Sequence, residues 1–400
     1  MPFVKSIRVW GAAVIAAAAI LSGCGQPPDY PPDLTFPTRD DRLVLRTPAD
    51  RQPASLGETG KLDVELAALD QLGGRTVDPA SAPADHRVAL DRFLTDTFGT
   101  PASPTVRADD QVTAITTKLG LTPEPLAEGG RLYRRRCLHC HGLPGDGRGP
   151  SGYGVYPPQP RDFRRGSFKF VSTGSGGKPR KTDLARTLRE GLKGTAMPPF
   201  GLMPAEQRDL LVQYVIYLSI RGEVEFQTLR AMLTEGDGGE SVEGDPAGFA
   251  RERLAAVVRD WNRAASTPAG PTPPPTPDDA GKQAPSHLDS VARGYHLFTD
   301  EGGTGCIKCH QDFGRKSGYW YDVWGTAVRP HNLTTGGFKG GNESNDLYQR
   351  IRSGILPSGM PAHPTLTDTQ VWDLVNFVRA LPYPRELPPA VRARVYPETQ

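Results

Sequence analysis

Apolar residues recur at spacings of three and four in several stretches of the chain, and this spacing predicts amphipathic helices. Two of these stretches, residues 61–72 and 85–98, stand near the N-terminus, and a third covers residues 222–262. The most apolar stretches read "DLLVQYVIYLS" from Asp209 and "WDLVNFVRALP" from Trp372. The pattern of hydrophobic positions therefore predicts a mainly α-helical protein.

The first residues form a different apolar pattern, in which two basic residues precede a continuous run that ends at Leu21. This order is typical of an export signal, and the run is too short for a bilayer span of ~20 residues. It ends in "LSGC", which resembles the lipobox of bacterial lipoproteins. We therefore expect residues 1–23 to be a lipoprotein signal peptide and Cys24 to anchor an exported protein to a lipid bilayer on the periplasmic side. Because Gly25 follows, the resemblance implies the outer membrane.

Changes in composition divide the rest of the chain. Gly and Pro number 45 and 40 of the 400 residues, well above their average usage, so much of the chain is predicted to be loop or linker. Residues 24–60 predict a Pro-rich tether with little packed structure, and residues 267–285 predict a stiff Pro-rich linker. We also expect a helical extension at 61–124, a helical connector at 226–266 and a C-terminal tail at 387–400.

Two regions of the chain, one on each side of the Pro-rich linker, repeat each other. "DLARTLREGLKGTAMPPF" and "DLYQRIRSGILPSGMPAH" align without gaps, and in both an Asp opens a predicted helix 14 residues before Met197 or Met360. Each region predicts the same order: a helix, a CxxCH motif, a Gly- and Pro-rich loop, a helix, a Met-Pro pair and a last helix. Residues 125–225 and 286–386 are therefore predicted to be two small domains of one duplicated unit.

Each predicted domain carries one CxxCH motif, "CLHCH" from Cys137 and "CIKCH" from Cys306. A structural zinc site would need its second Cys pair within roughly 15–20 residues, whereas these pairs lie 169 residues apart. A thioredoxin-like dithiol would need a βαβ context that neither domain predicts. A c-type haem uses every residue of the motif, because two thiols bond to the haem and the adjacent His binds its iron. We therefore expect two covalently bound haem c groups, each with its iron.

This arrangement resembles class I cytochromes c in tandem, joined by the Pro-rich linker, and is similar to respiratory-chain and oxidase-linked diheme cytochromes c of bacteria. The resemblance implies covalent attachment of haem through Cys137, Cys140, Cys306 and Cys309. It implies axial ligation of the two irons by His141 with Met197 and by His310 with Met360. It also makes Pro160 and Pro330, or a nearby proline such as Pro158, candidates to accept a hydrogen bond from the proximal imidazoles.

Other side chains compete with these assignments. Met203 has no counterpart methionine in the second domain, which favours a packing role. His331 and His363 could ligate the second iron, but the first domain has no histidine at the matching positions. Trp320 and Trp324 replace a Gly-rich loop of the first domain and are expected to cover the second haem.

Charge separates the two predicted domains. The whole chain has a net charge of +2, which gives no argument for nucleic acid as a partner. Residues 126–225 contain 17 Lys and Arg against 9 Asp and Glu, a net charge of +8, whereas residues 286–386 contain 10 of each kind. The basic residues around the first motif predict either a solvated face with neutralised haem propionates or a docking patch for an acidic redox partner. They include Arg134, Arg135, Arg136, Arg164 and Arg165.

These observations favour a membrane-anchored diheme cytochrome that passes single electrons between a redox donor and an acceptor. A membrane respiratory complex or a terminal oxidase is the expected partner, and the protein itself does no bond chemistry. A haem enzyme such as a diheme peroxidase is the enzymatic alternative, because an open iron invites peroxide chemistry. A cytochrome subunit of a larger oxidoreductase complex is a third, since residues 61–125 and 222–262 could form assembly surfaces.

Overall fold

The computed structural model describes residues 30–48, 69–152, 158–174, 176–234, 240–266, 286–300 and 303–397. The predicted signal peptide, Cys24 and the linker at 267–285 lie outside the described residues, as do parts of the predicted tether and extension. Among the helices that the structure describes, none has both the length and the hydrophobicity needed to cross a bilayer. The expected export signal and lipid anchor stay predictions.

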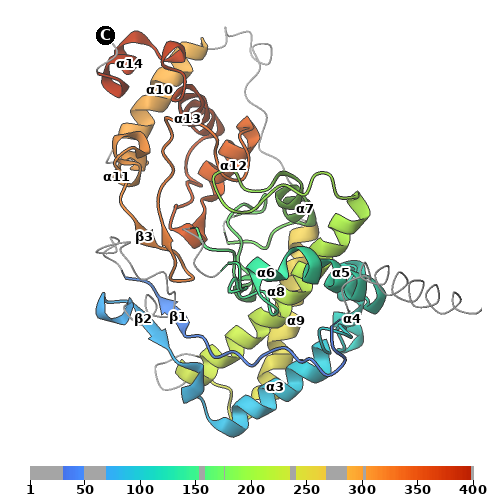
Figure 1. Ribbon diagram of the computed structural model, residues 1–400. Helices are drawn as coiled ribbons and strands as arrows, with labels where there is room; N and C mark the ends of the chain where they lie inside the picture. Colours follow the sequence, from blue (N-terminus) through green and yellow to red (C-terminus); the bar gives the residue numbers. More distant parts are fainter. Residues whose placement is uncertain are drawn as a thin grey trace, which may run out of the picture.

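The described chain is mainly helical, as predicted, and its helices form two domains in tandem. The first domain contains α5 (Pro123–Arg136), α6 (Leu138–His141), α7 (Lys181–Glu190) and α8 (Ala205–Thr234). The second domain contains α10 (His287–Thr299), α11 (Cys306–Cys309), α12 (Ser344–Ser353) and α13 (Asp368–Ala380). Figure 1 shows the second domain, in orange and red, stacked on the first domain, in green. The helices follow one another in the order that the sequence repeat predicts.

Glycine lets the first and last helices of each domain cross at close range. A Cβ atom on Gly129 of α5 would lie 2.5 Å from the backbone oxygen of Leu210 in α8. A Cβ atom on Gly294 of α10 would lie 2.0 Å from the backbone oxygen of Asp373 in α13. Neither distance leaves room for a side chain, and the aromatic residue four positions after each glycine is buried. The repeated Gly-aromatic spacing therefore marks the helix crossing of each domain.

The third helices of the two domains, α7 and α12, begin in the same way. The carboxylate of Asp183 accepts a hydrogen bond from the backbone N–H of Arg180 at 2.9 Å, and that of Asp346 accepts one from Glu343 at 3.0 Å. A carboxylate in this position satisfies a backbone donor that the helix leaves without an internal partner. The prediction that these two aspartates open matching helices is confirmed.

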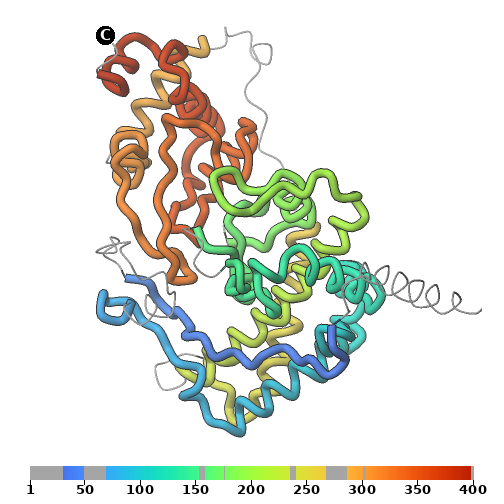
Figure 2. The backbone as a smooth tube through the Cα atoms, viewed as in Figure 1, coloured from blue at the N-terminus to red at the C-terminus, as the bar shows by residue number. Residues whose placement is uncertain are grey.

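The N-terminal segment packs against the first domain. Its strand β1 (Leu43–Arg46) pairs antiparallel with β2 (Arg75–Val77). Phe36 is buried, and its ring lies 6.3 Å from the ring of Tyr217 in α8. Figure 2 shows this segment, in blue, running along the lower part of the molecule. The tether predicted for residues 24–60 is therefore wrong over 30–48, because its few apolar side chains find a core to pack on.

The connector predicted at 226–266 also belongs to the first domain. Helix α8 continues past residue 225 without a break, and α9 (Pro246–Ser266) packs against it. Leu254 and Trp261 of α9 are buried in the same core as α8. The helices α3 (Ala84–Phe98) and α4 (Asp110–Lys118) cover α9 from the other side. The predicted boundary at 225 is therefore misplaced, because the apolar surface of α8 needs this cover.

The second domain carries a short hairpin and a closing helix. The hairpin, residues 320–328, consists of β3 (Trp320–Tyr321) and β4 (Ala327–Val328), paired antiparallel. The helix α14 (Pro389–Val395) packs on the domain through Val391 and Val395, so the predicted tail at 387–400 is helical and packed over this stretch. Short 3-10 helices are η2 (Pro79–Ser81), η3 (Phe163–Arg165), η5 (Gln311–Gly314), η6 (Leu356–Ser358) and η7 (Pro384–Glu386).

Candidate functional site

One cavity of about 840 Å³ joins the two CxxCH motifs. His141 and Met197 of the first domain and His310 and Met360 of the second domain all line it. The apolar part of its wall comes from α7, α8, α12 and α13, with Leu184, Leu188, Val212, Val215, Leu347, Ile351, Leu374 and Val378. The structure thus brings the residues predicted for both sites into one concave, largely apolar space, which is typical of cofactor sites.

A backbone carbonyl holds each proximal histidine. The Nδ1 atom of His141 lies 3.2 Å from the backbone oxygen of Arg161, and Nδ1 of His310 lies 3.2 Å from that of His331. Because a carbonyl oxygen only accepts, Nδ1 carries the proton in both rings and Nε2 keeps a free lone pair for a metal. Burial lowers the pKa of both imidazoles to about 4, so both are neutral at physiological pH, as a metal ligand must be.

The acceptors lie one residue after the prolines that the sequence predicts. Pro160 and Pro330 both line the cavity, but neither supplies the accepting oxygen. The carbonyl of Pro160 faces Gly147, where a Cβ atom would lie 2.4 Å from it, and the carbonyl of Arg161 turns toward the imidazole instead. The same offset recurs in the second domain. The prediction was therefore wrong by one position in each domain.

The two loops that carry the methionines share a backbone hydrogen bond. The carbonyl of Met197 accepts a hydrogen bond from the backbone N–H of Leu192 at 3.1 Å, and that of Met360 accepts one from Ile355 at 3.0 Å. Both methionine side chains are half-buried and pack against the core of their own domain. His363, three residues after Met360, lines the same cavity. The structure therefore keeps both methionines, and His363 beside one of them, within the site.

The other competing side chains have separate partners. Met203 packs against the first core and is absent from the cavity lining, in agreement with the predicted packing role. The Nε2 atom of His331 lies 3.0 Å from the backbone oxygen of Gly336, to which it donates. Because the carbonyl of His331 also holds the proximal histidine, this residue stands on the proximal side of the second site.

Two protein-family models match the chain. The family described as cytochrome c oxidase, cbb3-type, subunit III matches residues 124–215, and the cytochrome c family matches residues 291–382. The chain contains two cytochrome c domains in tandem. These domains imply two covalently bound haem c groups with their irons.

One solved structure is similar to a larger part of the chain than either family model. A chain of the reducing HAO-like protein complex of Kuenenia stuttgartiensis is 26% identical, with 64% of this chain and 95% of that chain covered and a TM-score of 0.45. No curated protein matches the sequence.

The charge of the cavity wall fits two haem c groups in the tandem cytochrome c domains. Among the described residues no Asp or Glu lines the cavity, whereas seven cations do. They are Arg136, Arg161, Lys169, Arg315, Arg329, Lys339 and Arg350. Haem carries two propionates, so two haem groups bring the anions that such a wall needs. Burial lowers the pKa of Lys169 to about 8, although the Asp322 carboxylate beside it opposes the shift, and burial lowers that of Arg350 to about 10.

Sequence reasoning overlooked two of these cations. Lys169 and Lys339 stand at the same position of the repeat, after Phe in "GSFKF" and in "GGFKG", and both line the cavity. The repeat itself could have pointed to these two lysines. A lysine that follows Phe at the same position of both copies can pair with a haem propionate in both domains. The charge count around the first CxxCH motif could not separate it from surface lysines.

The four cysteines of the CxxCH motifs all line the cavity. Burial raises the pKa of the Cys137 thiol to about 12 and also raises that of Cys306. In the part of the chain that the structure describes, no three His, Cys, Asp or Glu side chains are grouped so that they could hold a metal ion.

The predicted arginine patch divides into two parts, and the buried part cannot dock a partner. Arg164 is 3% exposed and donates to the Asp41 carboxylate at 2.7 and 3.0 Å. Arg165 donates to the backbone oxygens of Val44 and Val323, so it links the N-terminal segment to the hairpin. The docking role predicted for Arg164 and Arg165 is therefore wrong, because both guanidinium groups hold internal junctions.

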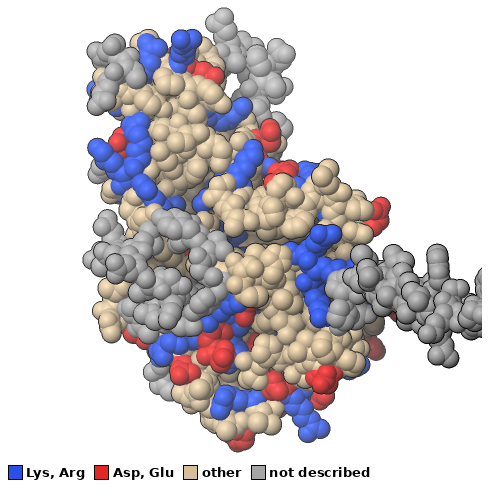
Figure 3. Space-filling model, in the orientation of Figure 1, with Lys and Arg blue, Asp and Glu red and all other residues tan. Residues whose placement is uncertain are grey.

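The other part of the patch lies in the last turn of α5. Arg135 and Arg136 are exposed, and the guanidinium of Arg134 lies 5.0 Å from the centre of the Tyr30 ring. Figure 3 shows Lys and Arg on both cytochrome c domains, whereas most acidic side chains of this face lie over the lower, N-terminal elements. A docking patch on the first domain is therefore limited to the last turn of α5.

The two tryptophans of the hairpin have different positions. Trp320 lines the cavity, and its Nε1 donates to the backbone oxygen of Ser358 at 2.7 Å. The Nε1 of Trp324 instead donates to the backbone oxygen of Asp162 in the first domain at 3.1 Å. Trp320 lies beside the second haem site, as predicted. Trp324 does not, because its side chain contacts the first domain.

Proposed function

We propose that this protein is a lipid-anchored diheme electron carrier, which passes single electrons between redox partners on the periplasmic side of a membrane. The observation that carries the proposal is the single cavity, whose lining contains both CxxCH motifs and both Met-Pro loops. Haem iron supplies one-electron redox chemistry when it is bound. An electron that enters one domain can therefore reach the other within the protein.

In this proposal the chain itself supplies every bond to the two haem groups. Cys137, Cys140, Cys306 and Cys309 would form the thioether bonds, and the two irons would be ligated by His141 with Met197 and by His310 with Met360. Ligation by Met and His would raise the reduction potential and would block substrate access to the iron. The apolar wall would exclude water, and cations of the wall such as Lys339 and Arg350 would pair with the propionates.

A potentiometric titration, followed by optical and EPR spectra, tests the ligand assignment. Met197→Ala and Met360→Ala should each change the spectrum of one haem, and each should lower the potential of that haem only. Met203→Ala is the matched control, because Met203 packs outside the cavity, and it should leave both haems unchanged. If Met360→Ala changes neither spectrum nor potential, the second ligand is a histidine such as His363.

Binding of carbon monoxide separates the carrier from the peroxidase alternative. Two six-coordinate ferrous haems should leave the optical spectrum unchanged under carbon monoxide, whereas a diheme peroxidase needs one iron that accepts a small ligand. Rapid binding at either haem of the native protein would overturn the electron-carrier assignment for that haem.

The partners proposed for this carrier are a respiratory donor and an acceptor such as a terminal oxidase. The match of the first domain to a subunit family of cbb3-type cytochrome c oxidase supports this class of partner. The exposed arginines Arg135 and Arg136 at the end of α5 are the proposed docking residues. Co-purification from membranes tests the choice between carrier and subunit, because one partner in constant ratio would favour a subunit of a larger complex.

The proposed anchor is Cys24 at the end of the export signal, with the outer membrane as the expected site. Its test is Cys24→Ser in cells of the native source. The variant should leave the membrane fraction, while an alanine at the neighbouring Gly25 should keep the protein membrane-bound. A Cys24→Ser protein that stays in the membrane fraction would rule out lipid anchoring at this residue.

A further inference from the structure

The hairpin of the second domain contacts the first domain through Trp324. The guanidinium carbon of Arg161 lies 3.6 Å from the centre of the Trp324 ring, and Trp324 Nε1 donates to the backbone oxygen of Asp162 at 3.1 Å. The indole is 7% exposed. A cation over an aromatic face is held most strongly when water is excluded. One side chain of the second domain therefore holds two consecutive residues of the first.

A buried carboxylate at the base of the same turn adds an electrostatic contact. The side chain of Asp322 is 0% exposed, and its carboxylate accepts a hydrogen bond from Lys169 Nζ at 3.0 Å. Its other oxygen accepts from the backbone N–H groups of Trp324 and Thr326 at 3.1 Å each, which fixes the carboxylate to the turn. A guanidinium nitrogen of Arg161 lies 3.9 Å away. The hairpin thus places a buried negative charge between two cations of the first domain.

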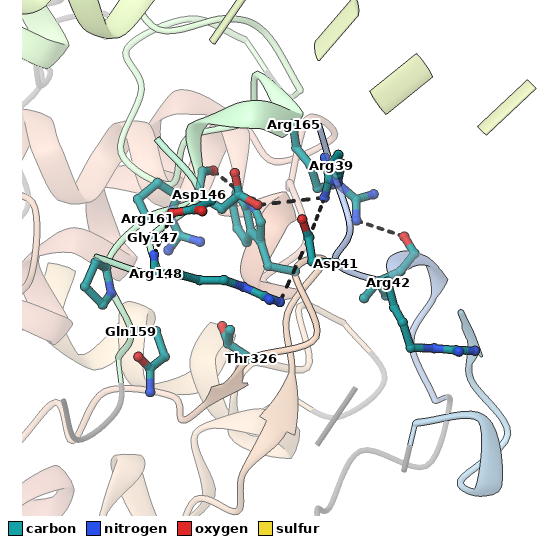
Figure 4. A pocket seen from close by; sticks show the side chains of 14 residues that line it. Arg39, Asp41, Arg42, Asp146, Gly147, Arg148, Gln159, Arg161, Arg165 and Thr326 are labelled. Carbon is teal, nitrogen blue, oxygen red and sulfur yellow. Dashed lines mark hydrogen bonds and ion pairs between the residues drawn. The ribbon is translucent and has the colours of Figure 1, made fainter. Parts of the chain in front are cut away.

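The segment that the hairpin holds also positions the first proximal histidine. The backbone oxygen of Arg161 accepts the hydrogen bond from His141 Nδ1 at 3.2 Å. Figure 4 shows the neighbouring small pocket, which is lined by Arg161 of the first domain, Asp41 of the N-terminal segment and Thr326 of the hairpin. A shift of Arg161 therefore changes the geometry of the bond that orients this imidazole.

Among the described residues, the contacts that position the second proximal histidine come from the second domain itself. The backbone oxygen of His331 holds His310 at 3.2 Å, and the His331 ring donates to Gly336 at 3.0 Å and packs against Phe338. All of these residues belong to the second domain. The proximal histidine of the second haem is therefore held from inside its own domain, whereas that of the first depends on its neighbour.

We propose that the hairpin is a positioning element for the first haem, in which Trp324 and Asp322 fix the Arg161 segment and thereby set the reduction potential of that haem. A hydrogen bond to Nδ1 increases the basicity of a ligating imidazole, which favours ferric iron. Loosening that bond, or removing the buried charge of Asp322, favours the ferrous state and raises the potential. The inference rests on the histidine ligation proposed above, but it needs no redox partner.

The test is a potentiometric titration of full-length, haem-loaded Trp324→Leu and Asp322→Asn. The matched control is Trp372→Leu, which removes an indole that lies 4.8 Å from the Tyr348 ring in the second domain and does not line the cavity. A parallel titration of Met197→His assigns the first haem, because its potential should fall in that variant. Haem content and limited proteolysis confirm that each variant is folded and loaded, and Asp322→Asn remains informative if Trp324→Leu does not fold.

Both hairpin variants should raise the first potential and leave the second unchanged. The expected size is about a threefold change in the ratio of reduced to oxidised first haem, roughly 30 mV at 59 mV per tenfold for one electron. The EPR signal of the first haem should also shift, since the imidazole plane is less constrained. An unchanged first potential in both variants, or equal shifts of both potentials, would overturn the proposal. If Met197→Ala leaves the first potential unchanged while the hairpin variants raise it, Met197 is not a ligand of the first iron, but the role of the hairpin stands.

Discussion

The two cytochrome c domains share one helix order but differ in how much of their core the haem completes. Among the described residues, the first core contains 35 buried apolar residues, drawn also from the N-terminal segment, α3, α4 and α9. Seven of these line the haem cavity. The second core contains 19, and again seven line the cavity. Haem therefore completes a much larger share of the second domain, while the first has a scaffold of its own.

The largest expected effect follows from removing one haem at a time. Cys306→Ala with Cys309→Ala should expose the second domain to protease, because over a third of its buried core faces the cavity. Cys137→Ala with Cys140→Ala should remove the first haem yet leave α3, α8 and α9 protected. Limited proteolysis with mass spectrometry measures both. Equal cleavage of the two domains in both variants would contradict this difference.

The junction between the N-terminal segment and the first domain should give the next largest effect. The side chains of Asp41, Arg39 and Arg164 are 4–6% exposed, with contacts of 2.7 and 3.0 Å. Asp41→Asn leaves two buried cations short of a counter-charge and should lower the free energy of unfolding of the first domain by about 3 kcal/mol. Arg186→Ala breaks a half-exposed pair with Asp346 and should cost about 0–1 kcal/mol. Denaturant unfolding compares the two variants, and similar losses would contradict the difference in burial.

The same junction predicts a dependence on pH. Burial raises the pKa of Asp41, but the charges of Arg39 and Arg164 outweigh it and hold that pKa well below the usual Asp value of 3.8. A lowered carboxyl pKa gives stability that is complete above the unfolded value and is lost only as pH falls through the folded value. The first domain should thus keep this stabilisation at pH 4 and lose it in stronger acid. In Asp41→Asn this acid step should be absent from the unfolding curves.

The helix crossings give a smaller, graded comparison. Gly129→Ala and Gly294→Ala each push a Cβ atom into a backbone oxygen, at 2.5 and 2.0 Å. Each should lower the free energy of unfolding by about 1–3 kcal/mol, with the larger loss in the second domain, where the contact is closer. Gly174→Ala is the control, because no heavy atom lies within 4 Å of its new Cβ. A larger loss of unfolding free energy in Gly129→Ala would contradict this order. It would mean that the additional helices of the first domain prevent α5 and α8 from moving apart.

The features that occur in both domains could be predicted from the sequence, because each recurs at the same position of both copies and has the same structural role in each. The CxxCH motifs, the Met-Pro loops, the Gly-aromatic spacing and the Asp at the start of α7 and α12 all stand where they were predicted. Apart from the acceptors of the two proximal histidines, the corrections fall on features that exist in one copy only. The packing of residues 30–48 and the burial of Arg164 depend on contacts between residues 123 positions apart, which no local pattern contains.

The two proximal hydrogen bonds show a finer limit. The sequence marked Pro160 and Pro330, but the accepting oxygens belong to Arg161 and His331. Which of two consecutive carbonyls faces an imidazole depends on one peptide orientation, and a motif does not specify it. The contact of Trp324 with the first domain could not be predicted for a related reason. Its position in the chain placed Trp324 near the second haem, and no local pattern shows which domain its side chain contacts.

The smallest expected effect concerns the surface of the first domain and sharpens the charge difference between the domains. Arg135→Ala should slow the oxidation of the reduced protein by ferricyanide roughly two- to fivefold at low ionic strength, because a positive field steers an anionic oxidant. Arg385→Ala, an exposed arginine of the second domain, is the control and should change the rate little. The Debye length is about 8 Å at physiological salt and shorter above it, so the difference should vanish at high salt. If both variants slow the oxidation equally, or if the slower rate of Arg135→Ala persists at high salt, Arg135 does not steer the oxidant. The net charge of +8 on residues 126–225 would then serve only to neutralise haem propionates.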